Sequence, residues 1–145
     1  MLLPTTVERV PKHTDPEVND HIRSVTQENV DRYANASQSA VERRVTELNA
    51  EWDIERTLEA NAATIILMGL GLGRFVDRRF YLLPAAVAGF LLQHALQGWC
   101  PPLPVFRRLG VRTQPEIEAE RHALLARHAH GRDSTSRVRF PGAQQ

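Results

Sequence analysis

The sequence predicts an all-α integral membrane protein, a hairpin of two transmembrane helices with amphipathic cytoplasmic helices on either side. Two apolar stretches, 60–73 and 80–106, carry no formal charge, and the turn between them contains three arginines and one aspartate. A helix in water needs a polar face, and the first half of the second stretch offers almost none. Capping signals and helically spaced apolar residues on both sides predict the flanking helices.

Helix-start signals define the segments outside the hairpin. Asp15, Pro16 and Glu17 combine an N-cap carboxylate, a proline in the first turn and an acid at the positive end of the helix dipole. Residues 113–116 repeat this arrangement with a threonine cap. We therefore divide the chain into a disordered tail (1–14), an amphipathic helical segment (15–58), the transmembrane hairpin (59–106), a basic segment with a capped helix (107–131) and a second disordered tail (132–145).

A further helix is predicted to begin at Ser39, with Glu42 as its capping-box partner three residues on. Its apolar positions follow at helical spacing: Val41, Val45, Leu48 and Trp52. Because no helix breaker separates this stripe from the apolar block, residues 39–73 are expected to form one nearly continuous helix. Gly131 is expected to end the last helix.

The flanking helices are too thin in apolar residues to be stable alone, since short isolated helices are marginal in water. We therefore expect the last helix to dock on the helix that begins at Ser39. The contact would join Ile117, Leu124 and Leu125 to Val45, Leu48 and Trp52.

The two apolar stretches fit a bilayer to different degrees. A hydrocarbon core of about 30 Å needs roughly 20 helical residues. The second span, about 80–99, has that length, whereas the first, about 60–76, reaches it only if the Arg74 side chain extends to the membrane surface. The alternative is a hairpin buried inside a soluble oligomer.

Charge is distributed unevenly along the chain. Residues 1–59 contain 7 basic and 12 acidic side chains, whereas residues 107–145 contain 8 basic and 4 acidic ones. No basic stripe with interleaved aromatic residues occurs, so nucleic acid is not expected as a partner. Arginines near the outer ends of the spans favour cytoplasmic termini, although the turn is basic as well. Arg107, Arg108 and Arg112 are expected to face lipid headgroups.

Small residues recur four positions apart in both spans, as Gly69 with Gly73 and as Ala85 with Gly89. Such pairs let helix backbones approach closely in lipid, where packing drives association. The pattern suits contact within one hairpin and contact between two copies equally well.

Polar side chains gather where the two spans are expected to lie side by side. Gln93, His94 and Gln97 stand near the end of the second span, and Asn61 and Thr64 stand near the start of the first. Unpaired polar groups are costly in hydrocarbon, so these side chains are expected to bond to one another or to a partner. A hydrogen-bonded clasp between the helices is favoured over a substrate site.

Cys100 is the one cysteine of the chain, which excludes an internal disulfide and a cysteine-only metal cluster. On a continuous helix it shares a face with Gln93 and Gln97. Its thiol is a candidate for redox or persulfide chemistry if Arg107 and Arg108 stabilise the thiolate. The alternative is that Cys100 acts only as a small apolar side chain. No catalytic residue, cofactor or metal site is predicted, because no acid, base and nucleophile occur together.

The stretch 91–101, followed by residues 107–110, resembles the YgaP-like transmembrane domain, a bacterial inner-membrane family of unknown function. In that family the second span ends in glycine, an aromatic residue, cysteine and proline, and a basic stretch closing on Leu-Gly follows. The matching residues are Gly98, Trp99, Cys100, Pro101, Leu109 and Gly110. The resemblance covers about residues 52–112, with a weaker extension to about residue 127, and it implies the bacterial inner membrane and, from some members, dimerisation there. Some members carry a sulfur-transfer rhodanese domain before the hairpin, but residues 1–58 are too few and too helical for one, so that activity is not implied.

These observations favour a small non-enzymatic inner-membrane protein that binds membrane lipid and assembles with itself or with another membrane protein. Two alternatives stay open. One is a thiol relay for sulfur or nitrosative species at Cys100, linked to sulfur metabolism through the resemblance. The other is an oligomeric conduit lined by Gln93, His94 and Gln97.

Overall fold

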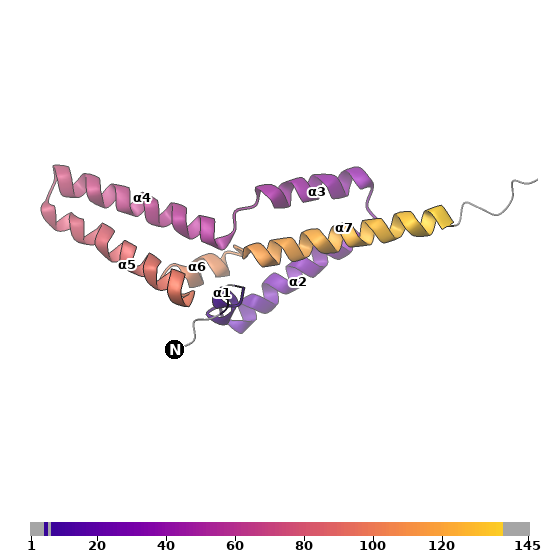
Figure 1. The fold of residues 1–145 in the computed structure, drawn as a ribbon, viewed down its shortest axis with the longest axis horizontal. Coiled ribbons are helices and arrows are strands. Elements are labelled where there is room, and N and C mark those ends of the chain that lie inside the picture. The colour runs from indigo at the N-terminus through magenta and orange to yellow at the C-terminus, as the bar shows by residue number, and fades with distance from the viewer. Residues whose placement is uncertain (1–4, 6, 138–145) are drawn as a thin grey trace, which may run out of the picture. The chain divides into compact units, whose positions relative to one another are not determined.

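The fold is that of a computed structural model, which describes residue 5 and residues 7–137. Within this part of the chain there are α-helices and one 3-10 helix but no β-strand, so the all-α class is confirmed. The elements are α1 (Arg9–Lys12), α2 (Pro16–Arg32), α3 (Gln38–Ala50), α4 (Ile54–Phe75), η1 (Arg78–Tyr81), α5 (Leu82–Gln97), α6 (Leu103–Arg108) and α7 (Gln114–Arg137). Figure 1 shows these helices.

The chain divides into two compact units that are interleaved in sequence. The first comprises Met1–Ile22 and Trp52–Gln114, and the second comprises Arg23–Glu51 and Pro115–Gln145. The first unit contains α1, the start of α2 and the α4–α5 hairpin. The second contains the rest of α2, together with α3 and nearly all of α7.

In the first unit, α4 and α5 form an antiparallel hairpin joined by η1 (Figure 1). Asp53 starts α4, because its carboxylate accepts the backbone N–H of Arg56 at 2.9 Å. Asp77 starts η1 in the same way, accepting the N–H of Arg79 at 2.7 Å. Gly98 ends α5 with a φ of +80°, a left-handed conformation that favours glycine.

Two glycines of α4 lie close against the residues that follow the turn, one against α5 and one against η1. A Cβ atom at Gly69 would lie 2.6 Å from Cδ of Pro84, and one at Gly73 would lie 2.7 Å from the Tyr81 ring. Gly89, in contrast, is exposed, and a Cβ there would meet nothing within 4 Å. The G-x-x-x-G pair of α4 therefore serves contact within the hairpin.

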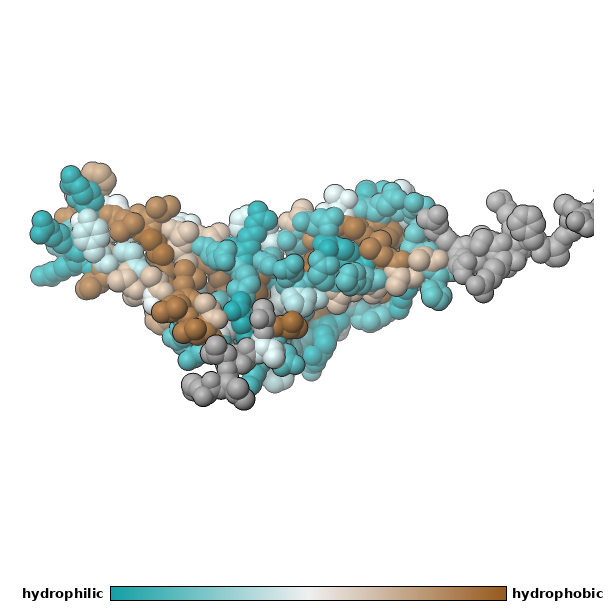
Figure 2. All heavy atoms as spheres, in the orientation of Figure 1, coloured by the Kyte–Doolittle hydropathy of each residue, from teal (hydrophilic) through white to brown (hydrophobic). Residues whose placement is uncertain are grey.

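Much of the hairpin's apolar surface is exposed. The exposed fractions of Phe75, Leu82 and Leu67 are 84%, 74% and 70%. Figure 2 shows hydrophobic residues spread over the hairpin and hydrophilic ones at its turn. Among the described residues, the stretch Arg78–Gln97 is the one helix long and apolar enough to cross a membrane. Helix α4 carries charged residues in its first turns and near its end, so it is less apolar than the stretch Arg78–Gln97.

The core of the first unit lies at the open end of the hairpin. Its buried members are Val10, Ile54, Leu58, Cys100 and Leu103. Val10 is only 3% exposed, so residues 7–14 do not form the expected disordered tail. The reason is that Val10 packs into this core. The expectation for residues 1–4 and residue 6 lies outside the described residues.

In the second unit, α2, α3 and α7 share a separate core. Its buried members are Val30, Val41, Leu48, Ile117 and Leu124, with Val45 packed against them. The expected docking of α7 on α3 is thus confirmed for Ile117 and Leu124 against Val45 and Leu48. It is wrong for the other two side chains, because Trp52 and Leu125 are about half exposed. The participation of Val30 from α2 was not expected.

Three helix boundaries differ from the expectations. Ser37 rather than Ser39 caps α3, since its hydroxyl accepts the Ala40 N–H at 3.3 Å. The expected continuous helix over 39–73 is interrupted between Ala50 and Ile54, because Glu51 is extended and Asp53 caps a new helix. At the other end, α7 continues through Gly131 to Arg137, since a single glycine costs a helix only about 1 kcal/mol. The expected tail beyond 137 lies outside the described residues.

Candidate functional site

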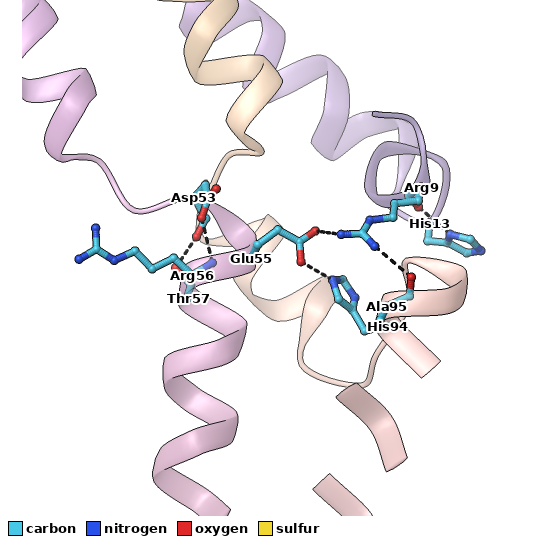
Figure 3. A network of polar contacts seen from close by, with 8 residues as sticks. All are labelled: Arg9, His13, Asp53, Glu55, Arg56, Thr57, His94 and Ala95. Carbon is cyan, nitrogen blue, oxygen red and sulfur yellow. Dashed lines mark hydrogen bonds and ion pairs between the residues drawn. The ribbon is translucent and has the colours of Figure 1, made fainter. Parts of the chain in front are cut away.

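The polar groups of the first unit converge at the open end of the α4–α5 hairpin. Glu55, in the first turn of α4, lies between the side chains of His94 and Arg9 (Figure 3). Its Oε2 is 2.9 Å from Nε2 of His94 on α5, and its Oε1 is 2.8 Å from the guanidinium of Arg9 on α1. Arg9 also donates to the backbone carbonyl of Ala95 at 3.0 Å. We call Arg9, Glu55 and His94 the basal cluster.

The position of Arg9 depends on the end of α5. The N–H of Gly98 donates to the carbonyl of His94 at 2.7 Å, which turns the chain away from the helix. A side chain at Gly98 would meet the carbonyl oxygen and Cβ of Arg9 at 2.6 Å. Glycine is therefore required here twice, once for the backbone conformation and once for the close approach of α1.

Cys100 follows this turn and lies in the core with Val10 and Leu103. It does not extend α5, so it does not share a helix face with Gln93 and Gln97, as a continuous helix would require. The Cys100 thiol is buried in the core of the first unit. Nδ1 of His94 is buried and has no hydrogen-bond partner within the described part of the chain.

The hydrogen bond to Glu55 fixes which nitrogen of a neutral His94 carries the proton. A carboxylate only accepts hydrogen bonds, so Nε2 must be the donor. In the neutral ring Nδ1 then holds a lone pair. The Glu55 carboxylate thereby holds the orientation of the imidazole.

The charge of Glu55 is stabilised by its partners. The hydrogen bond from His94 lowers the pKa of Glu55 from its usual value near 4.5, and the charge of Arg9 adds to this effect. Partial burial of the carboxyl opposes the shift without reversing it. Glu55 is accordingly an anion at neutral pH.

An apolar cavity of about 120 Å³ lies between α4 and α5. Its walls include Ala62 and Ile65 from α4 and Val87 and Phe90 from α5. Cys100 forms part of the wall. The thiol is therefore shielded from solvent but adjoins empty apolar space.

The expected polar clasp takes a different form from the one predicted by the sequence. Of its five residues, His94 bridges the two helices through Glu55. Thr64 instead donates to the carbonyl of Ala60 in its own helix, at 2.8 Å. The side chains of Asn61, Gln93 and Gln97 make no hydrogen bond within the described part of the chain, and Gln97 is exposed.

The three arginines expected to face lipid differ in exposure. Arg107 is 1% exposed and donates to Thr14 and Asn19 side chains, at 3.2 Å and 2.9 Å. Arg112 is 6% exposed. Of the three, Arg108 alone is exposed, so the lipid-facing role fits that residue alone. The bonds of Arg107 also show that its guanidinium is engaged away from Cys100, with Thr14, Asn19 and the carbonyl of Val111.

Sequence reasoning missed Glu55 and Arg9. Glu55 has a detectable signal: in an antiparallel hairpin, the first turn of the first helix lies opposite the last turn of the second, where His94 stands. Arg9 has none, because its bond to Glu55 spans 46 residues and leaves no periodic trace in the surrounding sequence. Within the described residues, no group of three or more histidine, cysteine or acidic side chains is arranged to hold a metal ion.

Comparisons with protein-family models, with curated protein sequences and with solved structures found no match to this chain.

Proposed function

We propose that this chain is a small non-enzymatic accessory protein of the bacterial inner membrane, with the α4–α5 hairpin embedded in the bilayer and both termini in the cytoplasm. The exposed apolar surface of the hairpin carries this proposal. Leu67, Phe75 and Leu82 are each at least 70% exposed. Soluble monomers rarely expose contiguous apolar patches beyond a few hundred Å², and lipid is the simplest environment for such a surface.

Helix length is compatible with this placement. The stretch Arg78–Gln97 serves as one span. The uncharged part of α4, residues 60–73, is about 21 Å long at 1.5 Å per residue, shorter than a hydrocarbon core of about 30 Å. Arg74 and the turn arginines reach the far surface by extending their side chains, and local thinning of the bilayer makes up the difference.

Self-association belongs to the same proposal. Gly69 and Gly73 contact other residues of the same hairpin, whereas Ala85 and Gly89 on α5 are exposed. Small residues four apart allow close helix contact in lipid. The face of α5 that carries Ala85 and Gly89 is therefore the surface for a second copy or another membrane protein.

Membrane embedding is tested by placing charges on the exposed hairpin surface. The double variant Leu67→Lys/Leu92→Lys adds two cations, each costing about 2.5–3.5 kcal/mol at the centre of a span. We expect this variant to be released by alkaline carbonate, while wild type stays in the membrane pellet. Leu125→Lys, on an exposed leucine of α7, is the matched control and should not be released. Retention of the double variant, or release of wild type, would contradict the proposal.

Orientation is tested by thiol labelling of intact cells in a Cys100→Ser background. An Arg78→Cys variant at the turn should react with an impermeant maleimide, whereas an Asn35→Cys variant between α2 and α3 should not. Both positions are exposed in the structure, so folding does not protect either one. The reverse pattern would show that the termini lie outside the cell.

The association face is tested by crosslinking in native membranes. Gly89→Leu should lower the yield of crosslinked dimer, because it thickens the exposed face of α5 without touching the hairpin packing. An unchanged yield would place the contact on another surface.

A further inference from the structure

Three arginines surround the turn of the hairpin and have no anionic partner within the described residues. Arg74 stands near the end of α4, and Arg78 and Arg79 belong to η1. All three residues are exposed, and their guanidinium groups make no hydrogen bond or ion pair within the described part of the chain. We call Arg74, Arg78 and Arg79 the arginine cluster.

The one acidic residue of the turn is engaged by the backbone. The Asp77 carboxylate accepts the N–H of Arg79 at 2.7 Å and so caps η1. It forms no ion pair with the arginine cluster, all of whose members belong to the described residues. Residues 74–79 carry three positive charges against one negative charge, a net charge of +2. The turn therefore presents an uncompensated positive charge to its surroundings.

The arginine cluster adjoins strongly exposed apolar side chains. Phe75 is 84% exposed and Leu82 is 74% exposed. The guanidinium of Arg74 lies over the Phe75 ring, 5.6 Å from its centre, so cation and apolar surface are in contact. Figure 2 shows hydrophilic residues at the turn next to hydrophobic ones along the hairpin. When these apolar side chains enter hydrocarbon, the arginines are held at the depth of the lipid headgroups.

Phosphate is the anion that suits this position. A guanidinium offers paired N–H donors in one plane, which match two oxygens of a phosphate. Attraction between opposite charges is also stronger where the surroundings are less polar than bulk water. An acidic segment of another protein would match the charge, but it would not account for the exposed Phe75 and Leu82 beside it. A phospholipid accounts for both features.

We propose that the turn of the α4–α5 hairpin is a binding site for anionic phospholipid. The arginine cluster bonds to the headgroup phosphate, and Phe75 and Leu82 lie against the acyl chains. This inference rests on the proposed embedding of the hairpin and adds a partner of defined charge. It gives the turn a selectivity that apolar surface alone does not provide, because hydrocarbon does not distinguish one headgroup from another.

The test uses the purified full-length protein in neutral detergent, titrated with phosphatidylglycerol or with phosphatidylcholine of the same acyl chains. Native mass spectrometry measures the fraction of protein that retains lipid, which gives an apparent dissociation constant for each lipid. We expect wild type to bind phosphatidylglycerol more tightly than phosphatidylcholine. The difference should shrink as the ammonium acetate concentration rises, because salt screens exposed charges.

Two double variants locate the site. Arg78→Gln/Arg79→Gln should bind phosphatidylglycerol about 30-fold more weakly than wild type, since each arginine near an anionic surface contributes about fivefold. Its binding of phosphatidylcholine should be unchanged. Arg32→Gln/Arg43→Gln removes the same charge from exposed positions on α2 and α3, and should leave the binding of both lipids unchanged. Circular dichroism verifies that both variants keep their helical content.

Failure of this proposal and failure of the membrane proposal give different results. Arg78→Gln/Arg79→Gln keeps the exposed apolar surface of the hairpin, so it should stay in the carbonate-washed pellet together with wild type. Equal binding of the two lipids by a protein that stays in the pellet contradicts the lipid site alone. Release of wild type by carbonate contradicts the embedding on which the lipid site rests.

Two results of the titration would overturn the proposal. One is equal binding of phosphatidylglycerol and phosphatidylcholine to wild type, a comparison that needs no variant and so cannot be confused with misfolding. The other is unchanged phosphatidylglycerol binding in a folded Arg78→Gln/Arg79→Gln protein, which would place the anionic lipid elsewhere, as at the exposed Arg108.

Discussion

Nε2 of His94 donates a hydrogen bond to Oε2 of Glu55 over 2.9 Å and thereby ties the last turn of α5 to the first turn of α4. The two residues are 39 positions apart, and Arg9 adds a third segment through its 2.8 Å ion pair with the same carboxylate. At the other end of the hairpin the contact is of a different kind, since Gly73 packs directly against the Tyr81 ring. The hairpin is thus held together by a hydrogen bond and an ion pair at one end, and by packing of an aromatic ring against a glycine at the other.

Replacing His94 by leucine should loosen the open end of the hairpin. The change removes a hydrogen bond to a charged group, for which about 1.5–3 kcal/mol is typical. Gln97→Leu is the matched control, because Gln97 is exposed and makes no hydrogen bond within the described residues. Hydrogen exchange of the first turns of α4 in detergent measures the effect. A larger effect from Gln97→Leu would show that Gln97, and not His94, holds the open end of the hairpin together.

The stability of the first unit should fall at acidic pH through Glu55. The hydrogen bond from His94 and the charge of Arg9 keep the pKa of Glu55 below its usual value near 4.5. Because the folded pKa lies below the unfolded one, the carboxylate stabilises the fold above about pH 4.5 and loses this contribution as the pH falls through the lowered pKa. The melting temperature in detergent should therefore decrease over that range.

Two variants separate Glu55 from other carboxylates in this experiment. Glu55→Gln should flatten the acidic decrease. Asp31→Asn should not, although hydrogen bonds from Arg127 and Gln27 lower the pKa of Asp31 as well, because that side chain is exposed. A decrease that persists in full in Glu55→Gln would assign the acid sensitivity to another group.

The glycines of α4 should differ sharply in their tolerance of a side chain. Gly73→Leu should disrupt the hairpin, since even a Cβ atom would lie 2.7 Å from the Tyr81 ring. Gly71→Leu should be tolerated, because a Cβ at that position meets nothing within 4 Å. Thermal unfolding followed by circular dichroism in detergent compares the two. Equal losses would mean that the close approach of α4 and η1 is not a requirement of the fold.

The cap of α3 should reside on Ser37. Ser37→Ala removes the acceptor for the Ala40 N–H and should cost about 1 kcal/mol, the usual value for an N-cap. Ser39→Ala changes the residue favoured by the capping-box pattern and should have a smaller effect. Hydrogen exchange within α3 measures the effect of both changes. A larger loss of protection from exchange in Ser39→Ala would show that the helix is capped by Ser39 instead.

The sequence allowed the helical class to be predicted because periodicity and capping are local signals. Asp15 and the Thr113 segment each marked a helix that the structure contains. Asp53 was missed as a cap, since the apolar stripe continues past it without interruption. Glu55 and Arg9 were missed for a different reason: Arg9 joins Glu55 across 46 residues, and α1 is brought there by the packing of Val10 into the core and by the bond from Arg9 to Ala95.

The docking of α7 on the second unit is best tested with two adjacent leucines. Leu124 is 2% exposed and packs with Leu48 and Val41, whereas Leu125 is 48% exposed. Leu124→Ala should therefore cost about 2–5 kcal/mol, the range for a buried leucine. Leu125→Ala should stay within about 0.5 kcal/mol, as for most surface substitutions.

The same pair distinguishes helix docking from attachment of the C-terminal segment to anionic lipid. Docking through Leu124 does not depend on lipid charge, so its loss should raise hydrogen exchange in α3 equally in neutral detergent and in anionic vesicles. Attachment through the exposed Arg108 would instead depend on lipid charge, at about 1 kcal/mol for one arginine. If Leu124→Ala leaves exchange in α3 unchanged in neutral detergent, α7 does not hold α3 in place through the shared apolar core.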